Sequence, residues 1–150
     1  MGAKPHAHVS LITLGVADVA RAAQFYEQLG FKRKMRKADG VAFFEAGAVV
    51  LSLYGKDALA ADSGLDAAKT AGFRATSLAW NCADEAGVDA VLALAVACGA
   101  KLLKPGHRIF WGGYVGFFED PDGKILALMS QVAGDPPIRL RGEVKQIDTD

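Results

Sequence analysis

The sequence predicts an α+β fold built from two copies of a β-α-β-β-β unit. Strand-like and helix-like segments follow one another in that order twice along the 150 residues. Equivalent residues mark the helix ends in both copies: Asp18 and Asp84 stand where the helices begin, and Gly30 and Gly99 stand where they end. A lone unit of about 65–75 residues would be only marginally stable, so we expect each unit to cover the other's sheet.

We expect a single domain over residues 1–150, divided into two modules, a connection and a tail. Module one is expected at about 8–54, the connection at 55–72, module two at 73–132 and the C-terminal tail at 133–150. The weakly alternating tail leaves three alternatives open, namely an edge strand, an ordered arm and a mobile end.

Module one begins with a β-branched, apolar run at residues 9–16, which is typical of a strand buried on at least one face. Behind Asp18, apolar residues recur at helical spacing and leave the polar ones for solvent. Glycine-containing turns then separate three expected strands, at residues 31–37, 41–45 and 48–54. The connection that follows is expected to hold a helical turn or two.

Module two repeats this order, with a strand at 73–82 and a helix that begins near Asp84. Three more strands are expected, at residues 101–104, 109–119 and 124–132. Gly112-Gly113 interrupts the long middle strand, and a bulge or a close backbone approach would explain it. Residues 120–123, Asp-Pro-Asp-Gly, form a strong turn signal, because Pro presets φ and Gly supplies a positive φ.

The composition argues against several classes of protein. Lys and Arg number 17 and are balanced by 17 Asp and Glu, whereas a protein that binds nucleic acid through charge carries a basic excess. The most apolar stretch, residues 88–100, is too short for a membrane span, and the N-terminus lacks the apolar run of a signal peptide. We therefore expect a cytoplasmic protein that binds neither nucleic acid nor membrane.

Two motifs resemble a known family. Residues 14–21, Leu-Gly-Val-Ala-Asp-Val-Ala-Arg, are followed by Phe25-Tyr26 and Leu29-Gly30-Phe31, and the Asp-Pro-Asp-Gly turn precedes the last strand. This pattern resembles the vicinal oxygen chelate superfamily, which comprises the glyoxalase, bleomycin-resistance and extradiol dioxygenase proteins. The resemblance implies that the modules curl their sheets into an open half-barrel, here called the cup, with the helices outside. It also implies a homodimer.

Metal-dependent members of that superfamily carry His or Glu at four positions inside the cup. The corresponding residues here are Leu11, Leu51, Ser77 (Ala75 in a different register) and Ala127. Leucine and alanine have no donor atom, and serine is a poor ligand for these metals. We therefore expect the family's fold without its metal, and no other cofactor.

Period-two counting along the strands predicts which side chains face the cup. The expected ligand-binding residues are Leu11, Thr13, Phe43, Leu51, Leu53, Ser77, Trp111, Phe117, Ala127 and Met129. Aromatic walls with one or two hydroxyls suit a small apolar or aromatic molecule. The alternative, that these side chains fill the cup and no ligand enters, stays open.

Three functions fit these residues. The first is metal-independent binding of a small apolar or aromatic molecule, similar to the bleomycin-resistance branch. The second is a glyoxalase- or dioxygenase-like enzyme, a lyase, isomerase or oxygenase with an atypical site. Such an enzyme would use an unusual metal set, for which His6 and His8 are candidates, or His107 as a general base, since histidine titrates near neutral pH. The third is a non-catalytic module that binds a partner.

Overall fold

The computed structural model describes residues 9–69, 76–109, 112–130, 139–140 and 147–148. Module one contains β1 (Leu11–Val16), α1 (Val19–Gln28), β2 (Lys32–Lys34), β3 (Val41–Ala46) and β4 (Val49–Gly55). A connection follows, with α2 (Lys56–Ser63) and a 3₁₀ helix (Ala67–Lys69). Module two contains β5 (Ser77–Asn81), α3 (Glu85–Ala97), β6 (Lys101–Arg108), β7 (Tyr114–Glu119) and β8 (Ile125–Ser130).

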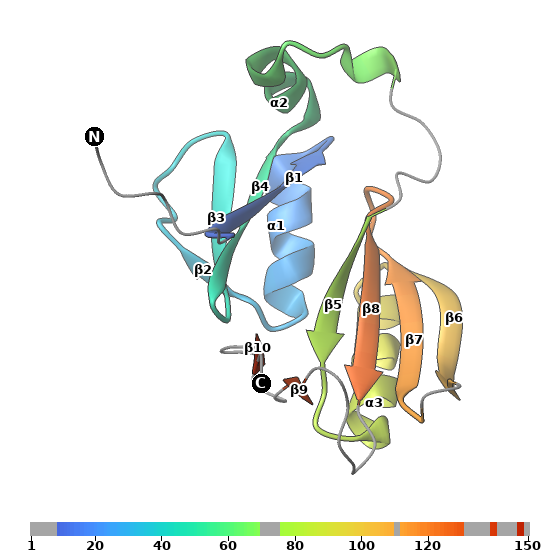
Figure 1. Cartoon of the computed structure of the whole chain (residues 1–150). Coiled ribbons are helices and arrows are strands. Elements are labelled where there is room, and N and C mark those ends of the chain that lie inside the picture. The colour runs from blue at the N-terminus through green and yellow to red at the C-terminus, as the bar shows by residue number, and fades with distance from the viewer. Residues whose placement is uncertain (1–8, 70–75, 110–111, 131–138, 141–146, 149–150) are drawn as a thin grey trace, which may run out of the picture.

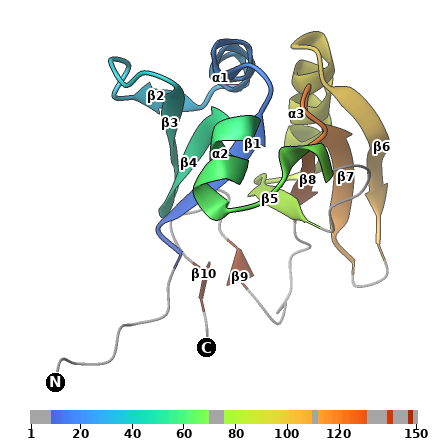
Figure 2. The ribbon, with the colours of Figure 1, turned by 90° about the horizontal axis from the view of Figure 1, so that it is seen from above.

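Within the described ranges, these strands form two four-stranded mixed sheets, in the orders β1-β4-β3-β2 and β5-β8-β7-β6. In each sheet the first strand of the module pairs in parallel with the last one, and the remaining pairs are antiparallel. The helices α1 and α3 lie on the same side of the two sheets (Figures 1 and 2). The α+β prediction is therefore confirmed, and the sheets form no closed barrel in the part described.

The tail contributes a short antiparallel ribbon made of β9 (Arg139–Leu140) and β10 (Ile147–Asp148). The other tail residues lie outside the described ranges, so the three alternatives for the tail stay open beyond this ribbon. No helix among the described residues has the length and apolar character that crossing a membrane requires.

The repeated helix boundaries are confirmed. The side chain of Asp18 accepts a hydrogen bond from the Arg21 backbone N–H, and Asp84 caps α3 in the same way. Gly30 and Gly99 follow the two helices with φ values of +108° and +107°, where a side chain would be strained.

The long strand predicted at 109–119 is wrong in its first part. Strand β6 continues to Arg108, and the segment with Gly112-Gly113 connects β6 to β7, with the Ile109 N–H donating to the Gly113 carbonyl oxygen at 2.9 Å. Pro105 and Gly106 suggest an earlier end of β6, but β6 is an edge strand, where a proline sacrifices no ladder bond. The ladder to β7 is irregular on both sides of Lys104.

One apolar core joins both modules. The ring of Phe25 on α1 packs against Phe118 of β7, with ring centroids 6.3 Å apart, and Tyr26 packs against Phe44 of β3 at 6.2 Å. The ring of Phe31 likewise packs against the ring of Trp80 on β5, with ring centroids 5.2 Å apart. Since Phe44, Phe118 and Tyr26 are fully buried, each module covers part of the other, as the size argument predicts.

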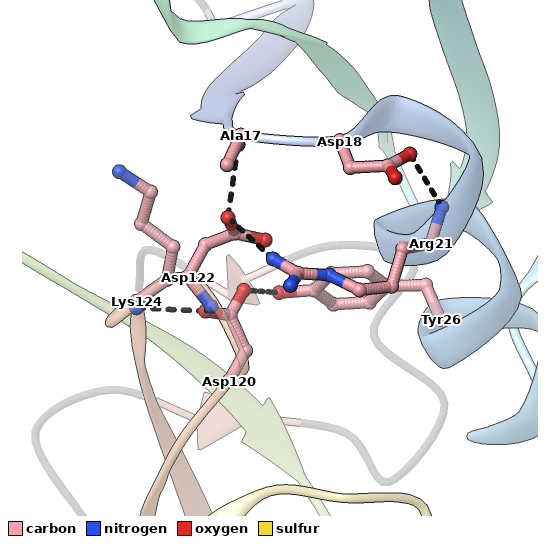
Figure 3. Close-up of polar contacts among 7 residues, drawn as sticks. All are labelled: Ala17, Asp18, Arg21, Tyr26, Asp120, Asp122 and Lys124. Carbon is pink, nitrogen blue, oxygen red and sulfur yellow. Dashed lines mark hydrogen bonds and ion pairs between the residues drawn. The ribbon is translucent and has the colours of Figure 1, made fainter.

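A set of polar contacts, here called the clamp, ties α1 and the residue Ala17 before it to the turn between β7 and β8 (Figure 3). The Tyr26 hydroxyl donates to Asp120 Oδ2 at 2.6 Å. The Ala17 backbone N–H donates to Asp122 Oδ1 at 2.9 Å, and Arg21 forms an ion pair with the same oxygen at 3.3 Å. These contacts span about a hundred residues of sequence, so the clamp fixes one module relative to the other.

Asp120 is the buried centre of the clamp, with 4% of its surface exposed. Its Oδ1 accepts the backbone N–H groups of Asp122 and Lys124, both at 2.8 Å. Burial raises the pKa of Asp120, and the hydrogen bond from Tyr26 counteracts part of that rise. Burial and the neighbouring carboxylate raise the pKa of Tyr26 far above its usual value, so this hydroxyl stays protonated and donates.

Candidate functional site

Each sheet has one face against the helices and one face turned away from them. Residues directly opposite each other on paired strands share a face, and successive residues alternate between faces. In sheet one, Leu14, Phe44 and Leu53 belong to the core with α1, and in sheet two Leu126 and Leu128 belong to the same core. The faces that carry their sequence neighbours, turned away from α1 and α3, are here called the open face.

Seven of the predicted ligand-binding residues lie on the open face by strand register. They are Leu11, Thr13 and Phe43 in sheet one, and Ser77, Phe117, Ala127 and Met129 in sheet two. Leu11 and Ser77 are exposed, whereas Ala127 is 5% exposed. The register thus places these side chains on the predicted side of each sheet, and none of these placements by itself shows a bound ligand.

Leu51 and Leu53 do not lie on this face. Leu51 is paired with Phe44 and Leu53 with Leu14, and all four side chains are in the core. The period-two count along this strand was therefore wrong by one residue, and such a slip turns every side chain of a strand to the other face. The alternation Leu-Ser-Leu at 51–53 is the signal that could have placed both leucines in the core.

Val50 and Ser52 take the place of those leucines on the open face, opposite Leu11 and Thr13. Ser52 is 3% exposed and Val50 is 38% exposed. Of the four positions for which the resemblance implies a metal ligand, Leu51 therefore lies in the core. The other three, Leu11, Ser77 and Ala127, lie on the open face, and none of them is a good ligand for a divalent metal.

The donor set of this face does not fit a divalent metal. Over the ranges that the structure describes, no three His, Cys, Asp or Glu side chains gather closely enough to hold a metal ion. His6, His8 and Trp111 lie outside those ranges. The thiol of Cys82 is also unsuited to nucleophilic work, because burial and the nearby Asp84 raise its pKa.

His107 lies on the edge strand β6, opposite Val115 of β7. Its ring Nδ1 is 2.9 Å from the Pro105 carbonyl oxygen and donates to it, which leaves Nε2 as the acceptor of the neutral ring. The next residue, Arg108, forms an ion pair with Glu85 of α3 at 3.0 Å. The role of His107 as a general base stays a prediction.

Asn81 is a residue of the open face that the sequence did not single out. It ends β5 opposite Met129, is 7% exposed, and its Oδ1 has no hydrogen-bond partner among the described residues. A polar residue at the end of an apolar strand was the available signal, but a strand end is also where solvent normally satisfies an amide.

Paired βαβββ modules, with helices on one side and an open face on the other, define a class of α+β fold. A model of the Glyoxalase/Bleomycin resistance protein/Dioxygenase superfamily matches residues 7–128. The chain belongs to this superfamily, as the motifs suggested. No curated protein matches the sequence.

Solved structures of the same fold include a glyoxalase-related enzyme from Fulvimarina pelagi, with 27% identity and a TM-score of 0.79 over 94% of this chain and 96% of that one. A glyoxalase/bleomycin resistance protein/dioxygenase family enzyme from Burkholderia phytofirmans PsJN has 18% identity and a TM-score of 0.76, covering 84% and 100%. A lactoylglutathione lyase from Agrobacterium tumefaciens has 19% identity and a TM-score of 0.61, covering 85% and 96%. The last two, at these identities, show the fold alone.

Proposed function

We propose that the chain binds a small apolar or aromatic molecule on the open face, without a metal and without transforming it. The observation that carries this proposal is the chemistry of that face, to which strand register assigns Thr13 and Phe43 in sheet one and Ser77, Phe117 and Met129 in sheet two. Apolar walls with a few neutral polar groups favour an uncharged ligand.

The test is a thermal-shift screen of neutral aromatic and aliphatic compounds in buffer that contains a chelator. A ligand that binds only the folded chain raises the melting temperature in proportion to its occupancy. Phe117→Ala and Trp111→Ala should each remove most of that shift, whereas Leu65→Ala should retain it, because Leu65 lies in the connection and is 72% exposed. A flat response over the whole screen would contradict the proposal.

A second candidate is an enzyme of the glyoxalase or dioxygenase kind. The similarity to the glyoxalase-related enzyme from Fulvimarina pelagi favours it, and His107 is the residue that would act as the base. This candidate predicts turnover that the His107→Gln variant loses, or a melting temperature that rises with Ni²⁺, Zn²⁺ or Fe²⁺. Neither effect is expected if the chain only binds its ligand.

We also propose that the chain forms a homodimer. Exposed apolar side chains on α3 and β6 support this, namely those of Leu94 and Val96 on the helix and Leu102 and Leu103 on the edge strand. Removing exposed apolar side chains from water would favour association. Sedimentation should give twice the mass of one chain, and a monomer at high concentration would contradict the proposal.

A further inference from the structure

Asn81 holds a buried acceptor that the described part of the chain leaves unused. The residue is 7% exposed, and among the described residues no donor reaches its Oδ1. Buried polar groups are almost always hydrogen-bonded, because an unsatisfied one loses its hydration without compensation. The position therefore calls for a partner that is not part of the described chain.

The neighbours of Asn81 on the open face are apolar. Strand register places Met129 opposite Asn81, Val115 opposite Met129, and His107 opposite Val115. Since neighbouring strands lie about 4.8 Å apart, this row runs about 14 Å along the sheet from the amide to the imidazole. A polar side chain thus stands at each end of the row, and Met129 and Val115 form an apolar strip between them.

A lone water is a poor partner for this acceptor. A buried water needs about two to four polar partners, and the side chains beside Asn81 in the row offer none. The adjacent backbone is also engaged, since the Cys82 N–H donates to the Met129 carbonyl oxygen at 2.7 Å. An apolar ligand with one donor of its own would satisfy the amide and cover the strip at once.

We propose that Asn81 accepts a hydrogen bond from the ligand of the open face, and that this ligand is a neutral aromatic or aliphatic molecule bearing a hydroxyl or amide N–H donor. The inference rests on the proposed ligand-binding function and narrows its ligand class. A carboxylate or phosphate is disfavoured, because its oxygens would face another acceptor.

The experiment compares three probes of matched size: 2-naphthol, which has a donor; 2-methoxynaphthalene, which has only an acceptor; and 2-methylnaphthalene, which has neither. Binding is measured by the change in Trp fluorescence and by the ¹⁵N shift of the Asn81 side-chain amide. We expect 2-naphthol to bind about tenfold more tightly than the other two, as one neutral hydrogen bond to a buried group provides.

Asn81→Leu should abolish that preference and leave the affinity for 2-methylnaphthalene unchanged or higher. Gln24→Leu is the matched control, because it removes an exposed amide from the solvent side of α1 and should change no probe's affinity. The ligand-free Asn81→Leu protein should melt at the same temperature as the wild type or above it. A clearly lower melting temperature would mean that the amide has a structural partner, and would overturn the inference.

The remaining outcomes separate the two proposals. If all three probes bind equally, and Asn81→Leu changes none of them, the open face binds ligands but Asn81 selects none, so only this inference fails. Tighter binding of 2-methoxynaphthalene would mean that the amide presents its N–H, which contradicts the donor class. If no probe binds at any concentration up to its solubility limit, both this inference and binding of two-ring aromatics fail.

Discussion

Removing the hydroxyl of Tyr26 tests how strongly the clamp contributes to stability. Tyr26→Phe preserves the ring that packs against Phe44 and removes only the donor to Asp120 Oδ2, 2.6 Å away. A hydrogen bond to a charged group contributes about 1.5–3 kcal/mol, and here its loss leaves a buried carboxylate oxygen without a partner. We expect a loss of about 2–3 kcal/mol at neutral pH, which for a chain of 150 residues lowers the melting temperature by roughly 5–10 °C.

The effect should depend on pH in a defined direction. Burial raises the pKa of Asp120 in the folded protein, so folding favours its protonated form and the carboxylate becomes a greater penalty as pH rises through the folded pKa. The Tyr26 hydrogen bond lowers that pKa and so reduces the penalty. Tyr26→Phe should therefore cost more near pH 7 than near pH 4, where a larger share of Asp120 is already protonated.

Urea unfolding followed by circular dichroism at both pH values measures these costs. Tyr54→Phe is the control, because the Tyr54 hydroxyl donates to Asp62 at 2.9 Å in an exposed position and its removal should change little. If Tyr26→Phe were no more destabilising than Tyr54→Phe, or if its cost were equal at the two pH values, the clamp would not stabilise the fold as argued.

Two further substitutions test the titration of Asp120 and the packing around Gly106. Asp120→Asn can keep all three hydrogen bonds, with Oδ1 accepting both backbone N–H groups and Nδ2 donating to the Tyr26 hydroxyl oxygen. The free energy of unfolding of this variant, relative to that of the wild type, should rise from about pH 4 to about pH 7. If the two proteins' free energies of unfolding ran parallel over this pH range, the titration assigned to Asp120 would be contradicted. Gly106→Ala places a Cβ against the ring of Tyr114 and the carboxylate of Asp89, and should cost about 1–3 kcal/mol in urea unfolding. Combined with Tyr114→Ala it should cost less than the sum of the two changes, and strict additivity would rule out the contact.

The sequence predicted the fold well because its signals are local and occur twice. Asp18 and Asp84 cap helices through contacts within three residues, and Gly30 and Gly99 need only their own backbone conformation. The clamp was not predictable in the same way. Tyr26 is 94 residues from Asp120, and no pattern in either segment indicates that partner.

The candidate site was predictable only where strand alternation is clear. In β4 the alternation Leu-Ser-Leu at 51–53 was the available signal, but the strand begins with the apolar pair Val49-Val50, and the count placed two core leucines on the open face. Asn81 escaped notice for a different reason. Its burial, and the lack of a donor to it among the described residues, depend on how the chain packs, whereas the sequence shows only an amide at a strand end.

The two faces of the sheets have different roles, and this difference indicates which residue determines ligand selectivity. Phe44, Phe118 and Leu53 hold the fold together on the helix side, and changes there would open cavities at the centre of the core. Exposed residues of the open face, such as Ser77, contribute little to stability and can vary at small cost. Asn81 differs from Ser77, because it is buried and its Oδ1 has no hydrogen-bond partner among the described residues. A buried open-face residue whose acceptor lacks a partner in the described part of the chain is therefore the residue at which ligand selectivity is to be sought.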